Sequence, residues 1–103
     1  MKNVVKLELF DGEKAIKSRV IEINEWYDGD FEEIDSEEYR SQNSVSLIKG
    51  TQYGEDGDIG EAWANYYDGL GRLIKAERYD SEYNLVDTEE FMYDQNGKIL
   101  KKV

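Results

Sequence analysis

The sequence lacks cysteine and histidine altogether, and it contains no proline among its 103 residues. Disulfides, thiolate nucleophiles, histidine general bases and imidazole-containing metal sites are therefore excluded. The lack of cysteine is typical of proteins from a reducing compartment. No stretch approaches the roughly 18–20 apolar residues of a membrane span, and the N-terminal residues do not resemble a signal peptide. We therefore expect a cytoplasmic, non-enzymatic protein without a membrane segment.

Basic residues are scarce relative to acidic ones, with 13 Lys and Arg against 24 Asp and Glu and a net charge of -11. Such a charge repels free nucleic acid and anionic membranes, and it attracts basic proteins at rates that fall with salt. Hydrophobic residues make up only 39% of the chain, but the 13% of aromatic residues can bury large areas. We therefore expect a folded chain, and we assign residues 1–103 to a single domain.

The surplus of acids is confined to one part of the chain. Residues 22–61 contain 13 acids and two bases, which accounts for the whole net charge of -11. The densest stretch is residues 28–38, called the acidic run below, with seven acids and no base. An aromatic pair comes directly before it. We predict that the partner-binding surface consists of this pair and these acids: Trp26, Tyr27, Asp28, Asp30, Glu32, Glu33, Asp35, Glu37 and Glu38.

A solvated loop that keeps the protein soluble is the ordinary interpretation of such a run. Three features favour a function instead. A solvated tail would not need the large aromatic pair. The apolar residues Phe31 and Ile34 within the run, and Tyr39 directly after it, suggest attachment to the fold. Concentrated like charge also destabilises a small domain by self-repulsion.

The second half of the chain repeats a tyrosine followed by turn-forming residues. The four frames begin at Tyr53, Tyr67, Tyr79 and Tyr93, with spacings of 14, 12 and 14 residues. Asp and Asn bond nearby backbone groups, and Gly adopts positive φ without a Cβ clash. Looser versions begin at Phe10 and Tyr27.

Strand-length segments separate these turns, and this pattern predicts consecutive antiparallel strands. We expect a mainly β fold, an antiparallel meander of hairpins forming a curled sheet or a partly open barrel. Sustained helical spacing is absent, so we expect at most one short helix, in residues 30–40, with Asp30 and Glu33 near its start. The predicted strands are residues 4–10, 15–26, 44–49, 61–67, 72–79, 85–93 and 98–103.

The frames at Tyr67-Asp-Gly-Leu-Gly-Arg-Leu-Ile and Tyr93-Asp-Gln-Asn-Gly-Lys-Ile resemble the tyrosine–aspartate (YD or RHS-type) repeat. In that family, repeated hairpins stack into long sheets, often as shells around bacterial toxins. The resemblance covers residues 53–103, and the frame at Tyr79 departs from it with Tyr83-Asn84 where glycine is expected. The resemblance implies the local hairpin fold, whereas four units are too few for a shell.

Other chemistry has weaker support in the sequence. Asp28-Gly-Asp30 and Asp56-Gly-Asp58 lack the glycine that an EF-hand requires at its sixth position, so we expect no metal site and no cofactor. Nothing singles out one pair of the many carboxylates for glycoside hydrolysis. Single-strand nucleic acid binding requires a basic groove, so we expect no direct contact with nucleic acid.

Three functions fit this pattern. The first is an inhibitor that occupies the basic groove of a nucleic-acid enzyme, as DNA mimics and anti-CRISPR proteins do as a class. In an extended segment, alternate carboxylates lie about 6.6 Å apart, close to two steps of roughly 3.4 Å along a DNA strand.

The second is an immunity protein for a bacterial toxin, with Trp26, Tyr27, Trp63 and Tyr66 as anchors. The third is a structural repeat scaffold, which would self-associate through its sheet edges. In the first two cases the expected partner is a basic protein.

Overall fold

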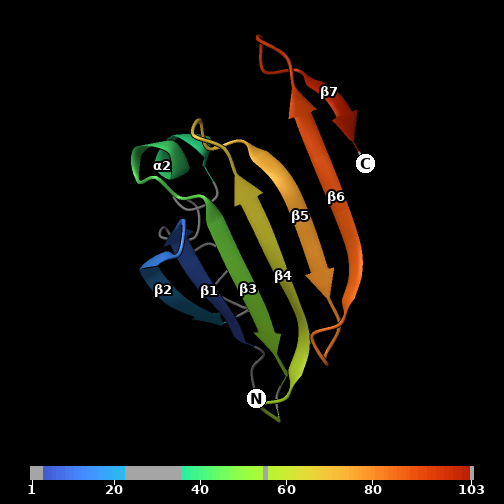
Figure 1. The fold of residues 1–103 in the computed structure, drawn as a ribbon. Coiled ribbons are helices and arrows are strands. Elements are labelled where there is room, and N and C mark those ends of the chain that lie inside the picture. Colours follow the sequence, from blue (N-terminus) through green and yellow to red (C-terminus); the bar gives the residue numbers. More distant parts are fainter. Residues whose placement is uncertain (1–3, 23–35, 55, 103) are drawn as a thin grey trace.

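The computed structural model describes residues 4–22, 36–54 and 56–102. Within these residues, seven strands form one antiparallel sheet, and a short helix lies beside one end of it (Figure 1). The mainly β fold predicted from the turn spacing is confirmed. The elements are β1 (Val4–Asp11), β2 (Lys14–Glu22), α2 (Glu37–Gln42), β3 (Leu47–Tyr53), β4 (Ile59–Tyr67), β5 (Leu73–Tyr79), β6 (Leu85–Tyr93) and β7 (Ile99–Lys102).

The strand order across the sheet is β2-β1-β3-β4-β5-β6-β7. From β3 onward, each strand pairs with its successor in the chain, as a meander requires. The first hairpin departs from this pattern, because β3 pairs with β1 and leaves β2 at the edge. The sheet is curled and does not close, so β2 and β7 are its two edge strands (Figure 1).

The four hairpins from β3 to β7 share one register. In each, the tyrosine that ends the first strand is the Cα partner of an aliphatic residue six positions later, and a β-bulge adjoins the tyrosine. A bulge increases the local twist, so its recurrence at every turn contributes to the curl of the sheet. The pairs are Tyr53 with Ile59, Tyr67 with Leu73, Tyr79 with Leu85, and Tyr93 with Ile99.

The register also defines the two faces of the sheet, because directly paired residues point to the same side. Leu7, Gly50 and Trp63 are successive partners on β1, β3 and β4, on what we call the core face. Their neighbours along the strands point the other way, to what we call the opposite face.

The core lies on the core face over β1 and β3. It contains Val5, Leu7, Leu9, Val45 and Ile48, all at most 5% exposed. Alternation along β1 places its three members on one side of the strand. Three aromatic residues pack against this cluster and extend it toward α2 and β4: Tyr39, Trp63 and Tyr67.

Strand β3 differs from its prediction, since it begins at Leu47 and ends at Tyr53 rather than covering residues 44–49. Ser44 adopts φ 55°, and the Val45 N–H donates to the Arg40 carbonyl, so these residues end the helix instead of entering the sheet. The strand then continues through Gly50, a residue that usually weakens strands. Here the Trp63 indole covers Gly50 and occupies the space of a side chain.

Helix α2 begins at Glu37, so it shares only residues 37–40 with the predicted helical segment 30–40. Its N-cap is Ser36, whose Oγ accepts a hydrogen bond of 3.1 Å from the Tyr39 N–H. The predicted start at Asp30 and Glu33 lies outside the described residues, as does the predicted extension of the second strand from residue 23 to Trp26.

Candidate protein-binding surfaces

Most of the predicted partner-binding residues, Trp26 to Asp35, lie outside the described residues. The last two, Glu37 and Glu38, form the first turn of α2, and both are exposed. Acidic side chains at this position interact favourably with the N-terminal end of the helix dipole. The C-terminal end of the acidic run is therefore part of the folded body.

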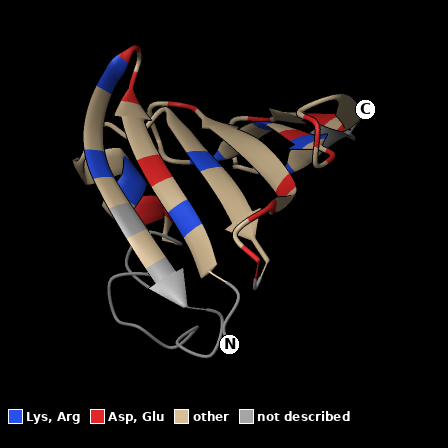
Figure 2. Cartoon of the chain, turned by 90° about the horizontal axis from the view of Figure 1, so that it is seen from below, with Lys and Arg blue, Asp and Glu red and all other residues tan. Residues whose placement is uncertain are grey.

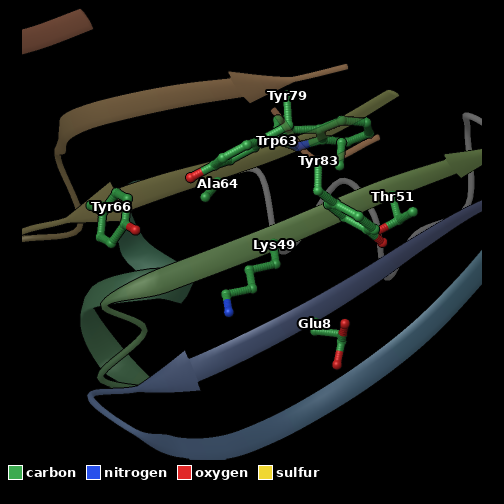
Figure 3. Close-up of a pocket in the computed structure, with 10 residues that line it drawn as sticks. Glu8, Lys49, Thr51, Trp63, Ala64, Tyr66, Tyr79 and Tyr83 are labelled. Carbon is green, nitrogen blue, oxygen red and sulfur yellow. The ribbon is translucent and has the colours of Figure 1, made fainter. Parts of the chain in front are cut away.

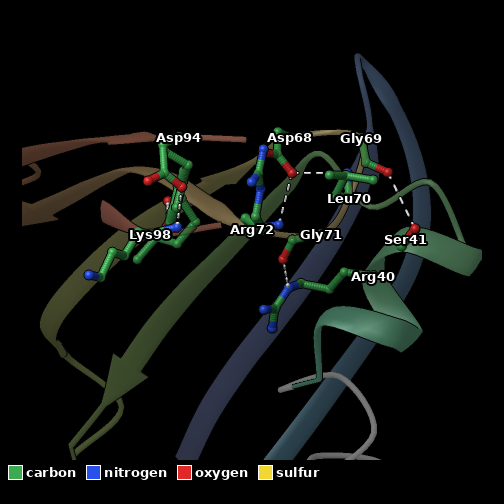
Figure 4. A network of polar contacts seen from close by, with 11 residues as sticks. Arg40, Ser41, Asp68, Gly69, Leu70, Gly71, Arg72, Asp94 and Lys98 are labelled. Atoms are coloured by element: carbon green, nitrogen blue, oxygen red, sulfur yellow. Dashed lines mark hydrogen bonds and ion pairs between the residues drawn. The ribbon is translucent and has the colours of Figure 1, made fainter. Parts of the chain in front are cut away.

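Two side chains of α2 bind the turn between β4 and β5 (Figure 4). The Arg40 Nε donates to the Gly71 carbonyl at 2.9 Å, and the Ser41 Oγ donates to the Gly69 carbonyl at 3.3 Å. Arg40 is 7% exposed, and its guanidinium carbon lies 4.2 Å from the centroid of the Tyr67 ring. These contacts attach the helix, and with it the end of the acidic run, to the sheet.

The turn that receives α2 is organised by Asp68 (Figure 4). Its carboxylate accepts hydrogen bonds from the Leu70 and Arg72 N–H groups, both at 2.9 Å, and pairs with the Arg72 guanidinium at 2.8 Å. Burial raises the pKa of Asp68, but the hydrogen bonds from Arg72 and Leu70 outweigh it and lower the pKa below its ordinary value. The ionised carboxylate is therefore a structural part of the turn.

The turns after Tyr79 and Tyr93 repeat this arrangement. Asp80 accepts from the Glu82 and Asn84 N–H groups, and Asp94 accepts from those of Asn96 and Lys98, all at 2.9 Å. In both turns the aspartate N–H also bonds the carbonyl four residues on. The frames recognised in the sequence thus correspond to one recurring turn.

One residue departs from the common turn, because Tyr83 occupies the position that glycine holds elsewhere. Gly57, Gly71 and Gly97 have φ of 85°, 78° and 81°, and Tyr83 has φ 63°. A left-handed conformation costs a residue with a side chain about 1–2 kcal/mol. In return, the Tyr83 ring is carried over the opposite face, where it lies beside Thr51 (Figure 3).

The opposite face carries a cleft of about 350 Å³ (Figure 3). Small side chains at its centre are almost fully buried, with Thr51 8% exposed and Ala62 and Ala64 each 4% exposed. The tyrosines form one side of the cleft and a charged pair of cross-strand partners forms the other. The polar and aromatic residues that line it are Glu8, Lys49, Thr51, Trp63, Tyr66, Tyr79 and Tyr83.

Glu77 links two of these tyrosines. The pKa of Tyr66 is raised to about 12, mainly by a hydrogen bond from its phenol to the Glu77 carboxylate and to a smaller extent by burial. Burial and a hydrogen bond to the same carboxylate raise the pKa of Tyr79. Lys75 lies 3.8 Å from Glu77, so the carboxylate is held between two phenols and an ammonium group.

A second depression of about 340 Å³ lies on the core face beyond the core, across β4, β5 and β6. We call it the carboxylate groove. Ala76 leaves space at its centre, Trp63 borders it on β4, and the exposed Arg78 lies between Trp63 and Asp87 in the cross-strand register. Four acidic residues line it. Glu77 on β5 belongs to the opposite face by its register, and the other three come from the strands on either side of β5: Glu61 on β4, and Asp87 and Glu89 on β6.

The described residues do not assemble a metal-binding group of three or more carboxylates. Asp56 instead accepts a hydrogen bond from the Asp58 N–H within the β3–β4 turn. In the part of the chain that the structure describes, no helix is long and apolar enough to cross a membrane.

Sequence reasoning singled out Trp63 and Tyr66 as anchors, and the register places them on different faces of the sheet. Tyr66 lines the cleft, and Trp63 borders both the cleft and the groove. It missed Asp87 and Glu89, which line the groove. Their alternate spacing along β6 was the available signal. The tyrosine and the aliphatic residue six positions later were likewise a readable signal for the hairpin register.

No protein family model, no curated protein and no solved structure matches the chain.

Proposed function

We propose that this chain is a non-enzymatic binding protein whose acidic run occupies the basic groove of a nucleic-acid enzyme, as an inhibitor of the DNA-mimic or anti-CRISPR-like type. The observation that carries this proposal is the anchoring of Glu37 and Glu38. Both acids are exposed on α2, directly before Tyr39, which packs on the core, and Arg40, which binds the β4–β5 turn. A run that ends in an anchored helix can present charge to a partner at a defined place.

Electrostatics supports a basic partner and disfavours direct binding of nucleic acid, because the net charge is -11. Asp28, Asp30 and Glu32 alternate in the sequence of the acidic run, and the described residues contain a similar pair. Asp87 and Glu89 alternate on β6 and line one groove, about 6.8 Å apart along the strand. This distance is close to two phosphate steps of roughly 3.4 Å.

The test measures binding and inhibition of nucleases and other nucleic-acid enzymes from the source cell and its phages. The triple variant Asp28→Asn, Asp30→Asn, Glu32→Gln should weaken binding and reduce its dependence on salt. The matched control removes three exposed acids elsewhere, by Glu13→Gln, Glu82→Gln and Glu90→Gln. Equal affinity and equal salt dependence in the two triple variants would refute a specific role for the acidic run.

An immunity protein for a bacterial toxin is the second candidate, and the cleft on the opposite face supports it. Tyrosine is enriched at the centres of protein interfaces, and three tyrosines border this cleft. A toxin gene beside the gene for this chain would favour immunity. In that case Tyr79→Ala and Tyr83→Ala should abolish protection of cells that express the toxin, while the acidic-run variant should retain it.

A repeat scaffold that self-associates through sheet edges is the third candidate, and the edge strands disfavour it. β2 is an outer strand with basic residues (blue in Figure 2), including Lys14 and Lys17. The sequence of β7 contains Lys101 and Lys102. Lysines at edges oppose strand-to-strand pairing, so we expect a monomer in size-exclusion chromatography with light scattering.

A further inference from the structure

The aromatic rings of this protein repeatedly bind cations. The Arg40 and Arg72 guanidinium carbons lie 4.2 and 4.6 Å from the Tyr67 and Tyr93 ring centroids. The Lys49 and Lys75 ammonium groups lie 5.4 and 5.6 Å from the Phe10 and Tyr66 centroids. Such contacts are favourable because the negative face of the ring attracts the positive charge.

Trp63 is one of several described aromatic residues without such a cation, although tryptophan has the ring best suited to this interaction. Within the described residues, no Lys or Arg lies over its indole. Arg78 is its direct partner on β5, but that guanidinium is not positioned over the ring. One side of Trp63 packs on the core, and the residue also borders the carboxylate groove.

The acidic residues of the groove could bind the same cation as the Trp63 ring. Glu61 and Asp87 are exposed, and neither forms an ion pair or side-chain hydrogen bond with another described residue. Glu89 is a third carboxylate on the same face, but it has an interaction partner of its own, so the surplus consists of Glu61 and Asp87 against the single base Arg78. The groove therefore combines an aromatic ring, a surplus of negative charge and a volume of about 340 Å³.

We infer that the carboxylate groove binds an arginine side chain of the basic partner, with its guanidinium between the Trp63 indole and the carboxylates of Glu61 and Asp87. The inference rests on the proposed function, because it specifies how a basic partner is recognised. Arginine fits better than lysine, since its planar guanidinium stacks on an aromatic ring and bonds carboxylates at its edge. Arg78 opposes the incoming charge and so lowers the affinity.

The probe is the peptide acetyl-Arg-Gly-Arg-amide, and its control is the same peptide with uncharged citrulline in place of arginine. The readout is the indole N–H resonance of Trp63, assigned with the Trp26→Phe variant, in which Trp63 is the single tryptophan. The arginine peptide should shift this resonance to saturation, and the citrulline peptide should not. An unchanged resonance with the arginine peptide would overturn the inference.

Three variants test the geometry. Glu61→Gln with Asp87→Asn should weaken peptide binding about threefold to tenfold, as expected for two partly exposed ion pairs. Arg78→Gln should strengthen it. The control is the double variant Glu90→Gln with Glu13→Gln, in which Glu90 lies on the opposite face of β6. It removes the same number of negative charges as the groove double variant and should leave the affinity unchanged. Equal losses in the two double variants would show general charge attraction and exclude the groove.

The outcomes also separate this inference from the proposed function. Suppose that a captured nucleic-acid enzyme binds the Glu61 and Asp87 variant with the affinity of the wild type but does not bind the acidic-run variant. The groove is then excluded and the proposed function stands. If the arginine peptide binds Trp63 and no nucleic-acid enzyme is bound or inhibited, the groove stands and the proposed function fails.

Discussion

Trp63 occupies the space in which the side chain of its cross-strand partner Gly50 would lie. The Gly50→Ala substitution would place a Cβ inside the indole, so the ring would have to leave both the core and the groove. We expect the free energy of unfolding to fall by about 2–3 kcal/mol, the upper part of the range for an overpacked core. Urea denaturation followed by fluorescence measures it.

A matched control lies one strand away at Gly60, where an added Cβ would meet the Gln52 carbonyl oxygen at an ordinary 3.7 Å. Gly60→Ala should change the stability by less than about 0.5 kcal/mol. If both alanine variants proved equally stable, the indole would not depend on the missing side chain at Gly50.

Gly71 and Gly97 are glycines for different reasons: both need a left-handed backbone, but only Gly71 also lacks space for a side chain. Both have positive φ. An added Cβ at Gly71 would overlap the Glu37 carbonyl of α2, whereas an added Cβ at Gly97 would meet no atom within 4 Å. Gly97→Ala should therefore cost only the left-handed conformation, about 1–2 kcal/mol. Gly71→Ala should cost about 2 kcal/mol more, because the helix must move. Hydrogen exchange of the α2 amides should rise in the second variant alone, and equal protection in both would argue against this docking.

Tyr83 provides the converse experiment, because it has a side chain at positive φ. Tyr83→Gly and Tyr83→Ala both remove the ring from the opposite face, but only glycine relieves the backbone. The glycine variant should therefore be more stable than the alanine variant by about 1 kcal/mol. Parallel thermal melts decide, and equal melting temperatures would mean that the backbone at this turn is not strained.

The aspartate turns make stability depend on acid pH. Hydrogen bonds from the Asn84 and Glu82 N–H groups lower the pKa of Asp80. Burial raises the pKa of Asp68, but hydrogen bonds from Arg72 and Leu70 outweigh it and lower that pKa. A lowered pKa in the folded state stabilises the protein above the unfolded value, roughly pH 4, and this contribution disappears as pH falls through the folded values. The urea midpoint should drop below about pH 4. Asp68→Asn with Asp80→Asn should flatten that drop, and parallel curves for the two proteins would contradict the assignment.

The strands and turns could be read from the sequence because their signals are local. Each frame carries its own turn chemistry, and the aspartate and the glycine of the Tyr67 and Tyr93 frames perform the expected roles. The pairing of β3 with β1 could not be read in this way. It joins residues about 40 positions apart, such as Leu9 and Ile48, and depends on burial of the shared core.

The candidate surfaces were less predictable for the same reason. The carboxylate groove joins Trp63 to Asp87 through a strand that lies between them, so its existence depends on the register of two hairpins. The acidic run was recognisable by composition alone. Its anchoring, in contrast, depends on Arg40 reaching the Gly71 carbonyl from a helix 31 residues earlier in the chain.

The common turn has a consequence for the evolution of this protein. From β3 onward each strand pairs only with its neighbours, and the sheet does not close, so nothing fixes the number of strands. Duplication of a segment of 12 or 14 residues that begins at a tyrosine would add one strand at the β7 edge and leave every earlier register unchanged. Loss of such a segment would remove one strand in the same way, so the width of the sheet can change between descendants while the core and α2 are conserved.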